Sequence, residues 1–232
     1  MSTLLEEQVI QRIQQELAEA ARSEENTKGG DRLTTPVVRR ISSQRFREVK
    51  HLDKERLFAL CEDLLESRNW PERAIAFDWA FRCRKRFEES DFATFERWLN
   101  AYVDGWGSCD NFCTHAFGSL VLQYPALIPN VMEWTESDDR WFRRAAAVVM
   151  LYSVRRGEHV DAAFQIADRL LLDEDDLVQK GYGWLLKEIG KCADPMRVFE
   201  YVMAHKDTMP RTALRYAIEK LDPDLRKKAM EK

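Results

Sequence analysis

Apolar residues recur every three or four positions along most of this chain, which is the spacing of an amphipathic helix. In the first segment, the stripe is formed by Leu4, Leu5, Val9, Ile13 and Leu17. A polar stretch over 23–30 interrupts the pattern, which then returns in segments of roughly 10–18 residues. The strict alternation of apolar and polar positions that indicates strands is absent from the sequence. The pattern predicts an all-α protein.

Boundary residues support several of the predicted helices. Pro36 is expected to begin a short helix, Asp53 to cap the next one, and Pro71 to lie in the first turn of a third. The later helices are predicted over 92–103, 112–122, 128–134, 141–152, 160–171, 177–189, 196–203 and 212–221.

Two of these helices resemble each other at an offset of 37 residues, which places Arg143 over Lys180 and Ala147 over Trp184. A period near 40 with two helices per unit is typical of HEAT-like repeats. We therefore predict a HEAT-like α-α superhelix, a curved solenoid of antiparallel helix pairs that forms a single domain over 1–232, with an N-terminal helix and polar turn over 1–30. Its inner helices would line a concave binding groove. A compact irregular helical bundle is the alternative.

Charge is segregated along the sequence. The 36 Lys and Arg against 40 Asp and Glu give a net charge of -4, whereas a nucleic-acid partner favours a basic surface. Locally, residues 28–56 carry a net charge of +5 and residues 161–176 are strongly acidic. One face could therefore be basic although the chain is acidic, or both patches could be plain solvated surface.

Other features of the composition indicate a cytoplasmic protein. No run of 18 apolar residues could cross a membrane, and the N-terminal residues lack the apolar core of a signal peptide. The five cysteines are odd in number and scattered, so we expect reduced thiols.

The segment over 104–118, DGWGSCDNFCTHAFG, is the most unusual. Gly105 and Gly107 flank Trp106, which predicts a loop, with Ser108 as the N-cap of the following helix and Asp110 in its first turn. An indole face beside a carboxylate can stabilise a cation. The alternative is that the tryptophan only packs and the aspartate only stabilises the helix.

Consecutive arginines begin another predicted helix. Arg143 and Arg144 project about 100° apart, so both could contact phosphates, or one could orient a carboxylate. The alternative is a surface pair, or salt bridges to Asp138 and Asp139.

Glycines interrupt the helix predicted over 177–189. Gly181 and Gly183 each cost about 1 kcal/mol relative to alanine, which suggests that another backbone or a ligand approaches closely. Trp184 would then stand over that space, and core packing of Trp184 is the alternative.

Metal binding and histidine chemistry are not expected. Cys109 and Cys113 could share a helix face, but His115 falls on another side, so we expect buried thiols. The sequence contains neither a Ser-His-Asp pattern nor an HExxH motif. We expect no cofactor.

Three ordered motifs resemble those of the AlkD-like family of DNA alkylation repair proteins. They are W-x-x-x-D at Trp106–Asp110, W-x-R-R at Trp141–Arg144, and K-x-x-G-W-x-L-[RK] at Lys180–Lys187. The resemblance covers about residues 55–220. It implies a HEAT-like-repeat DNA glycosylase that excises cationic N-alkylated purines, such as 3-methyladenine and 7-methylguanine, from double-stranded DNA without metal or cofactor.

The resemblance also implies roles for individual residues. Trp106 would lie against the sugar of the damaged nucleotide, and Asp110 would stabilise positive charge at its anomeric carbon and position water. Arg143 would bind the adjacent phosphate, and Trp184 would close the other side of the groove. Contacts to the DNA backbone are expected from Arg144, Lys187, Lys180, Arg39 and Arg40.

Two departures distinguish this chain from the family pattern. The stretch from Thr35 to Arg40 only approximates the family's Val-Pro-x-Leu-Arg, and Gly107 stands where many relatives have Asp. Two other functions therefore stay open: a HEAT-like protein that binds DNA without chemistry, and a scaffold for a protein partner. We expect a monomer.

Overall fold

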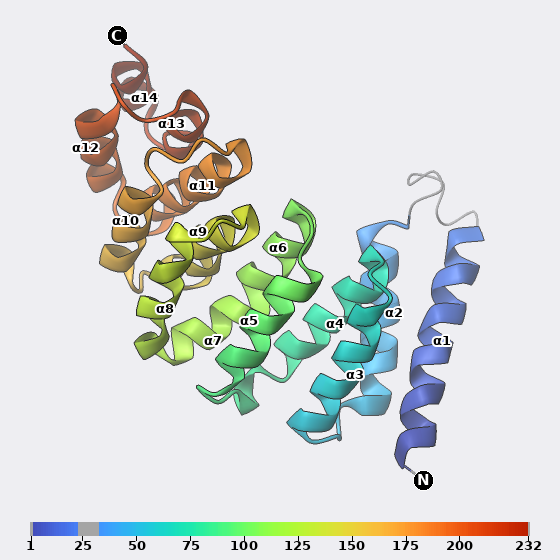
Figure 1. The fold of residues 1–232 in the computed structure, drawn as a ribbon. Coiled ribbons are helices and arrows are strands. Elements are labelled where there is room, and N and C mark those ends of the chain that lie inside the picture. Colours follow the sequence, from blue (N-terminus) through green and yellow to red (C-terminus); the bar gives the residue numbers. More distant parts are fainter. Residues whose placement is uncertain (1, 23–32, 232) are drawn as a thin grey trace. The chain divides into compact units, whose positions relative to one another are not determined.

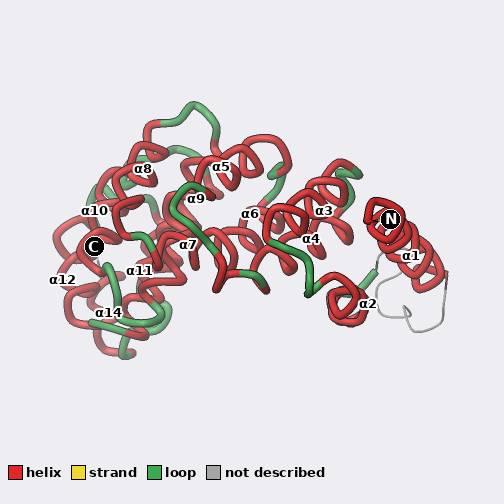
Figure 2. The backbone as a smooth tube through the Cα atoms, turned by 90° about the horizontal axis from the view of Figure 1, so that it is seen from below, coloured by secondary structure: helices red, strands yellow, loops and turns green. Residues whose placement is uncertain are grey.

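The computed structural model describes the backbone of residues 2–22 and 33–231, and side chains from residue 7 onward. Within these ranges, every regular element is a helix, joined by short loops (Figure 2). The prediction of an all-α fold is confirmed. The predicted polar turn over 23–30 lies outside the described residues, as do Lys28 and Arg32 of the basic stretch.

The described helices group into two compact units, Met1–Phe87 and Glu88–Lys232. The single domain over 1–232 stays a prediction. The N-terminal unit consists of α1 (Ser2–Arg22), α2 (Thr35–Val49), α3 (Lys54–Glu66), α4 (Trp70–Arg82) and the short η2 (Arg84–Arg86). In this unit, α1 packs on α2, and α3 packs on α4.

The helix starts in this unit follow the sequence signals. The Asp53 carboxylate accepts a hydrogen bond from the amide of Arg56, as expected for an N-cap, and Pro71 lies in the first turn of α4. Pro36 lies in the first turn of α2, which continues to Val49 and is longer than the short helix expected.

The C-terminal unit contains most of the predicted helices (Figure 1). Its elements are α5 (Asp91–Tyr102), α6 (Trp106–Phe112), η3 (Cys113–Phe117), α7 (Gly118–Gln123), η4 (Pro125–Leu127), α8 (Ile128–Glu133), η5 (Trp134–Glu136), α9 (Arg140–Val154), α10 (Val160–Arg169), α11 (Asp176–Cys192), α12 (Pro195–His205), α13 (Arg211–Ala217) and α14 (Pro223–Met230). The sequence pattern did not predict α14, which is short and rich in charge.

A π-helical turn joins α6 to α7 without a break, so residues 106–123 form one continuous helical segment. Such turns are rare and occur frequently at functional sites. Phe112 and Phe117 of this segment pack against Phe95 and Trp98 of α5, and all four rings are fully buried. The ring centroids are 5.3 Å apart in the pairs Phe95–Trp98, Phe95–Phe112 and Phe112–Phe117. This aromatic core fixes the segment that carries the candidate site.

Equivalent helices of successive repeats run parallel in this unit. Near the start of α9, Arg144 donates to the carbonyl of Leu177 at the start of α11, and just beyond its end Arg155 pairs with Glu188 in the last turns of α11. Asp139 and Asp175 cap the two helices in the same way, each accepting from the amide two residues later. The two capping aspartates are 36 residues apart, one fewer than the predicted offset of 37.

Glycines allow these parallel helices to approach closely. A Cβ at Gly183 would lie 2.8 Å from the carbonyl oxygen of Ala213 and 2.8 Å from the Cβ of Tyr216, both on α13. A Cβ at Gly118 would lie 2.6 Å from the Cβ of Tyr152 on α9. The expectation that another backbone approaches the glycines of α11 is confirmed at Gly183.

None of the helices described is both long and apolar enough to cross a membrane.

Candidate functional site

Helix α6 begins at Trp106, and this corrects the expectation of a loop around the tryptophan. The N-cap is Gly105, whose backbone is extended, and the hydroxyl of Ser108 donates to its carbonyl at 2.9 Å instead of capping a later helix. Asp110 is therefore the fifth residue of the helix and lies beyond its first turn. The glycines misled the prediction because glycine is well accepted at an N-cap such as Gly105, and a single glycine at Gly107 costs the helix only a small loss of backbone entropy.

The side chains of Trp106 and Asp110 share one face of α6, because residues four apart lie one above the other on a helix. Trp106 is 62% exposed, which is unusual for so large an apolar side chain. Its indole is therefore available to a ligand and makes little contribution to the core.

The carboxylate of Asp110 is held by Arg144 of α9. Nε of Arg144 donates to Oδ1 at 3.0 Å, and Nη2 donates to Oδ1 at 2.8 Å and to Oδ2 at 2.9 Å. The side chain of Arg144 is 6% exposed and that of Asp110 is 20% exposed. Such a charge-assisted fork fixes both the position and the rotation of the carboxylate.

Helix α11 completes the support of this pair. Nη1 of Arg144 donates to the carbonyl of Leu177, and the aliphatic stem of Arg144 lies over Gly181, where a Cβ would be 3.4 Å from its Cγ. Three helices, α6, α9 and α11, thus meet at the Asp110–Arg144 pair.

The protonation of Asp110 reflects two opposed influences. Burial raises the pKa of its carboxyl above the ordinary value, and the charge and hydrogen bonds of Arg144 partly offset that rise. The carboxylate is consequently a stronger base than an exposed aspartate.

Arg143 and Arg144 differ in what they contact. Nε of Arg143 lies 2.7 Å from Oδ2 of Asp173, and its Nη1 donates to the carbonyls of Ser137 and Asp138. The structure therefore brings Arg144, not Arg143, to Asp110. The sequence could not separate the two, because the choice depends on how α9 is rotated about its axis.

Trp184 of α11 is half-exposed and lies between two charged side chains. Its Nε1 donates to Oε1 of Glu188 at 3.3 Å, and the guanidinium of Arg155 lies 5.5 Å from its ring centroid. Nε of Arg155 also donates to Oε2 of Glu188 at 3.1 Å. Sequence reasoning missed Arg155 and Glu188, although the spacing of four between Trp184 and Glu188 was a usable signal.

The lysines expected to contact DNA are paired within the protein. Nζ of Lys180 lies 2.5 Å from Asp176, and Nζ of Lys187 lies 3.1 Å from Glu219. Arg39 and Arg40 are exposed on α2 of the N-terminal unit. Their DNA contacts, like the catalytic roles of Trp106, Asp110, Arg143 and Trp184 and the backbone contact of Arg144, stay predictions.

The thiols of Cys109 and Cys113 are fully buried, as expected. Burial raises the pKa of Cys113 well above its ordinary value, with further increases from the neighbouring Cys109 and Asp110. Over the residues that the structure describes, no group of His, Cys, Asp and Glu side chains is arranged to hold a metal ion.

Comparisons with known proteins identify a family and a similar fold. A family model described as "DNA alkylation repair enzyme" matches residues 10–221. Among solved structures, a "Predicted DNA alkylation repair enzyme from Enterococcus faecalis" is similar with a TM-score of 0.71 and 21% sequence identity, over 82% of this chain and 87% of that one. None of the curated proteins matches the chain significantly.

Proposed function

Because this chain belongs to the DNA alkylation repair enzyme family, which implies a role in the repair of alkylated DNA, we propose that it is a DNA glycosylase. Its substrates would be cationic N-alkylated purines in duplex DNA, such as 3-methyladenine and 7-methylguanine. The observation that carries the proposal is the Asp110 carboxylate, fixed by Arg144 one helical turn after the exposed indole of Trp106.

The chemistry of such a substrate suits this pair of side chains. A purine that already carries a positive charge is a good leaving group, so bond breaking needs no general acid. As the glycosidic bond breaks, positive charge develops on the sugar in an oxocarbenium-like transition state. A preorganised carboxylate and the face of an indole both stabilise a cation in a partly dehydrated site.

The hydrogen bonds of Asp110 indicate which oxygen acts. Oδ1 accepts two hydrogen bonds from Arg144, which fill its two lone-pair sites, whereas Oδ2 accepts one. Among the residues with described side chains, Oδ2 therefore retains a lone-pair direction without a donor. We assign to it the contact with the sugar cation or with the water that attacks the anomeric carbon.

The other candidate residues complete this hypothesis. Trp184 would lie on the opposite side of the damaged nucleotide, and Arg143 would bind the adjacent phosphate. Since Arg143, Lys180 and Lys187 each hold a carboxylate in the free protein, DNA would have to displace these partners. The exposed pair of Lys180 with Asp176 contributes at most about 1 kcal/mol, which a phosphate can replace. Displacing Arg143 from Asp173 would cost more, because Asp173 is only 8% exposed and Arg143 also donates to two backbone carbonyls.

The experiment is single-turnover release of 7-methylguanine and 3-methyladenine from methylated duplex DNA by the purified full-length chain. Asp110→Asn should lower the excision rate by at least about 100-fold, the effect of losing one preorganised electrostatic group. Binding to unmodified duplex should persist.

The matched control is Asp78→Asn, because Asp78 is also paired with an arginine, Arg82 of α4, at 2.8 Å. This variant should excise at the wild-type rate. Equal rates for Asp110→Asn and wild type would refute the mechanism. Binding without any excision by the wild-type chain would instead favour a non-catalytic DNA-binding protein, and absence of binding at low salt would favour a protein scaffold.

A further inference from the structure

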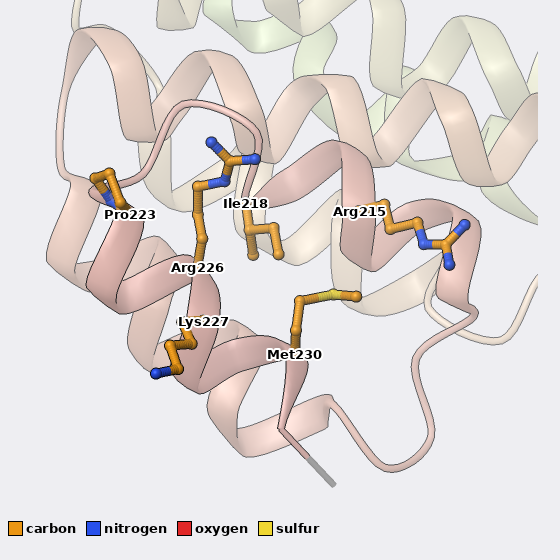
Figure 3. A pocket seen from close by; sticks show the side chains of 6 residues that line it. All are labelled: Arg215, Ile218, Pro223, Arg226, Lys227 and Met230. Atoms are coloured by element: carbon orange, nitrogen blue, oxygen red, sulfur yellow. The ribbon is translucent and has the colours of Figure 1, made fainter.

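A hollow of about 490 Å³ lies between α13 and α14, at the C-terminal end of the chain (Figure 3). It is lined by Arg215, Ile218, Pro223, Arg226, Lys227 and Met230. Ile218 and Met230 lie between Arg226 and Arg215 (Figure 3). In that view the side chain of Arg226 extends upward, that of Arg215 to the right and that of Lys227 to the lower left, so the three charged groups point away from one another.

The three basic side chains of this hollow have no partner in the part of the chain that the structure describes. Among the residues that the structure describes, Arg215, Arg226 and Lys227 make neither an ion pair nor a hydrogen bond through their side chains, and all three are exposed. The basic residues around Asp110 differ, because Arg144, Arg143, Lys180 and Lys187 are each neutralised by a carboxylate. The positive charge of the hollow is therefore available to a negatively charged ligand.

The surrounding sequence reinforces this charge. Residues 211–230 contain six Lys and Arg and three Asp and Glu, a local net charge of +3 in a chain whose net charge is -4. One of the three carboxylates, Glu219, holds Lys187 and Lys220. Another, Asp222, caps α14. Over the described ranges, none of the three carboxylates, Asp224 included, makes an ion pair with a cation of the hollow.

We propose that this hollow binds the phosphate backbone of duplex DNA, away from the Asp110–Arg144 pair. A single small anion would be best held by cations that converge on one point, whereas these extend apart around an apolar floor. Duplex DNA carries about one negative charge per 1.7 Å of its axis, so it can meet separated cations at once. The choice of DNA as the polyanion rests on the proposed function.

The chain offers a closely matched control. Arg211 precedes Arg215 by one turn of α13, and Lys228 follows Lys227 on α14, yet neither Arg211 nor Lys228 lines the hollow. The test compares Arg215→Gln/Lys227→Gln with Arg211→Gln/Lys228→Gln. Both variants remove two positive charges from the same two helices, and all four side chains are exposed, so folding should be unaffected.

The measurement is the dissociation constant of the full-length chain for unmodified duplex as a function of salt concentration. Each phosphate contact contributes about 0.9 to the slope of log K against log salt. The lining variant should therefore reduce the slope by about 1.8 and weaken binding at low salt, while the control variant keeps the wild-type slope.

Equal slopes of log K against log salt for the two variants would overturn the proposal. An acidic protein would then be the better candidate for the partner of this hollow. Displacement of DNA by inorganic phosphate at constant ionic strength, in wild type but not in the lining variant, would also overturn it in favour of a free anion. Because no base is excised in this assay, the outcome is separate from that of the proposed function. A chain that binds duplex through the hollow but releases no base would refute only the glycosylase.

Discussion

Arg144 donates three hydrogen bonds to the carboxylate of Asp110, which lies 34 positions earlier in the sequence. The pair joins α6 to α9, and Nη1 of the same guanidinium joins α9 to α11. The buried side chain of Arg144 thus connects α6, α9 and α11 at the carboxylate that we propose as catalytic.

Removing Arg144 should shift the pH dependence of excision. Burial raises the pKa of Asp110 and Arg144 lowers it, so the carboxylate form is lost at a higher pH than for an exposed aspartate. The rate should rise with pH through this pKa and then level off. In Arg144→Gln the influence that lowers the pKa is gone. The acid limb, which is the part of the pH–rate profile where the rate rises with pH, should therefore shift to higher pH when single-turnover excision is measured.

Arg144→Lys is the control for this shift, because it keeps a positive charge but loses the fork. Its acid limb should lie between those of wild type and Arg144→Gln. An acid limb that does not move in either variant would mean that Arg144 acts independently of the Asp110 charge.

Replacing Trp106 should affect activity without affecting stability. The indole is 62% exposed, so Trp106→Ala should change the free energy of unfolding by less than about 0.5 kcal/mol. If the ring stabilises the sugar cation, excision should fall about 3–30-fold, which corresponds to a cation–π contribution of about 0.6–2 kcal/mol. Urea unfolding and single-turnover excision measure the two effects.

Trp98→Ala provides the contrast, since Trp98 is fully buried and its loss should cost about 3–5 kcal/mol. A large loss of stability in Trp106→Ala would show that its ring belongs to the core and would remove it from the proposed site.

The two glycines of α11 should respond differently to alanine. At Gly183 the new Cβ would lie 2.8 Å from backbone of α13, whereas at Gly181 its nearest neighbour would be the Arg144 stem at 3.4 Å. Gly183→Ala should therefore destabilise the fold by about 1–3 kcal/mol. Gly181→Ala should be neutral or gain up to about 1 kcal/mol from helix propensity.

Thermal unfolding of both variants checks this difference. Equal changes in Tm would contradict the close packing of α11 on α13.

Glu188 should stabilise the fold in a pH-dependent way. Burial opposes its ionisation, but the hydrogen bond and charge of Arg155, aided by Trp184 and Lys191, lower its pKa overall. A lowered pKa in the folded state gives stability that is present above the ordinary pKa of glutamate and is lost as the pH falls through the folded value. Glu188→Gln should cost about 1–3 kcal/mol at neutral pH and less in acid.

Glu219→Gln is the matched control, because Glu219 also pairs with a lysine of this region but is 46% exposed. It should cost less than about 1 kcal/mol, since solvent screens exposed pairs. Urea unfolding at neutral and acid pH distinguishes the variants, and equal costs would contradict a buried role for Glu188.

Much of the fold could be predicted from local signals. Helical periodicity, the cap at Asp53 and a repeat of nearly 40 residues depend on residues a few positions apart or on a regular spacing, so they can be recognised without tertiary contacts. The sequence pattern did not predict α14, because this helix is short and has few apolar residues at helical spacing.

The candidate site was predictable only in part. The face shared by Trp106 and Asp110 follows from their spacing of four, wherever the helix starts. The partner of Asp110 does not, because adjacent arginines point in different directions and only the rotation of α9 decides that Arg144 turns inward while Arg143 meets Asp173.

By itself, the sequence determined the helical class and the spacing that places Trp106 and Asp110 on one helix face, because these depend on composition and on neighbours along the chain. The tertiary structure alone decided which basic side chains hold carboxylates and which, at the end of the C-terminal unit, lack partners among the residues described. The physical reason is that ion pairing depends on distances of a few ångströms between helices, and no local pattern encodes those distances.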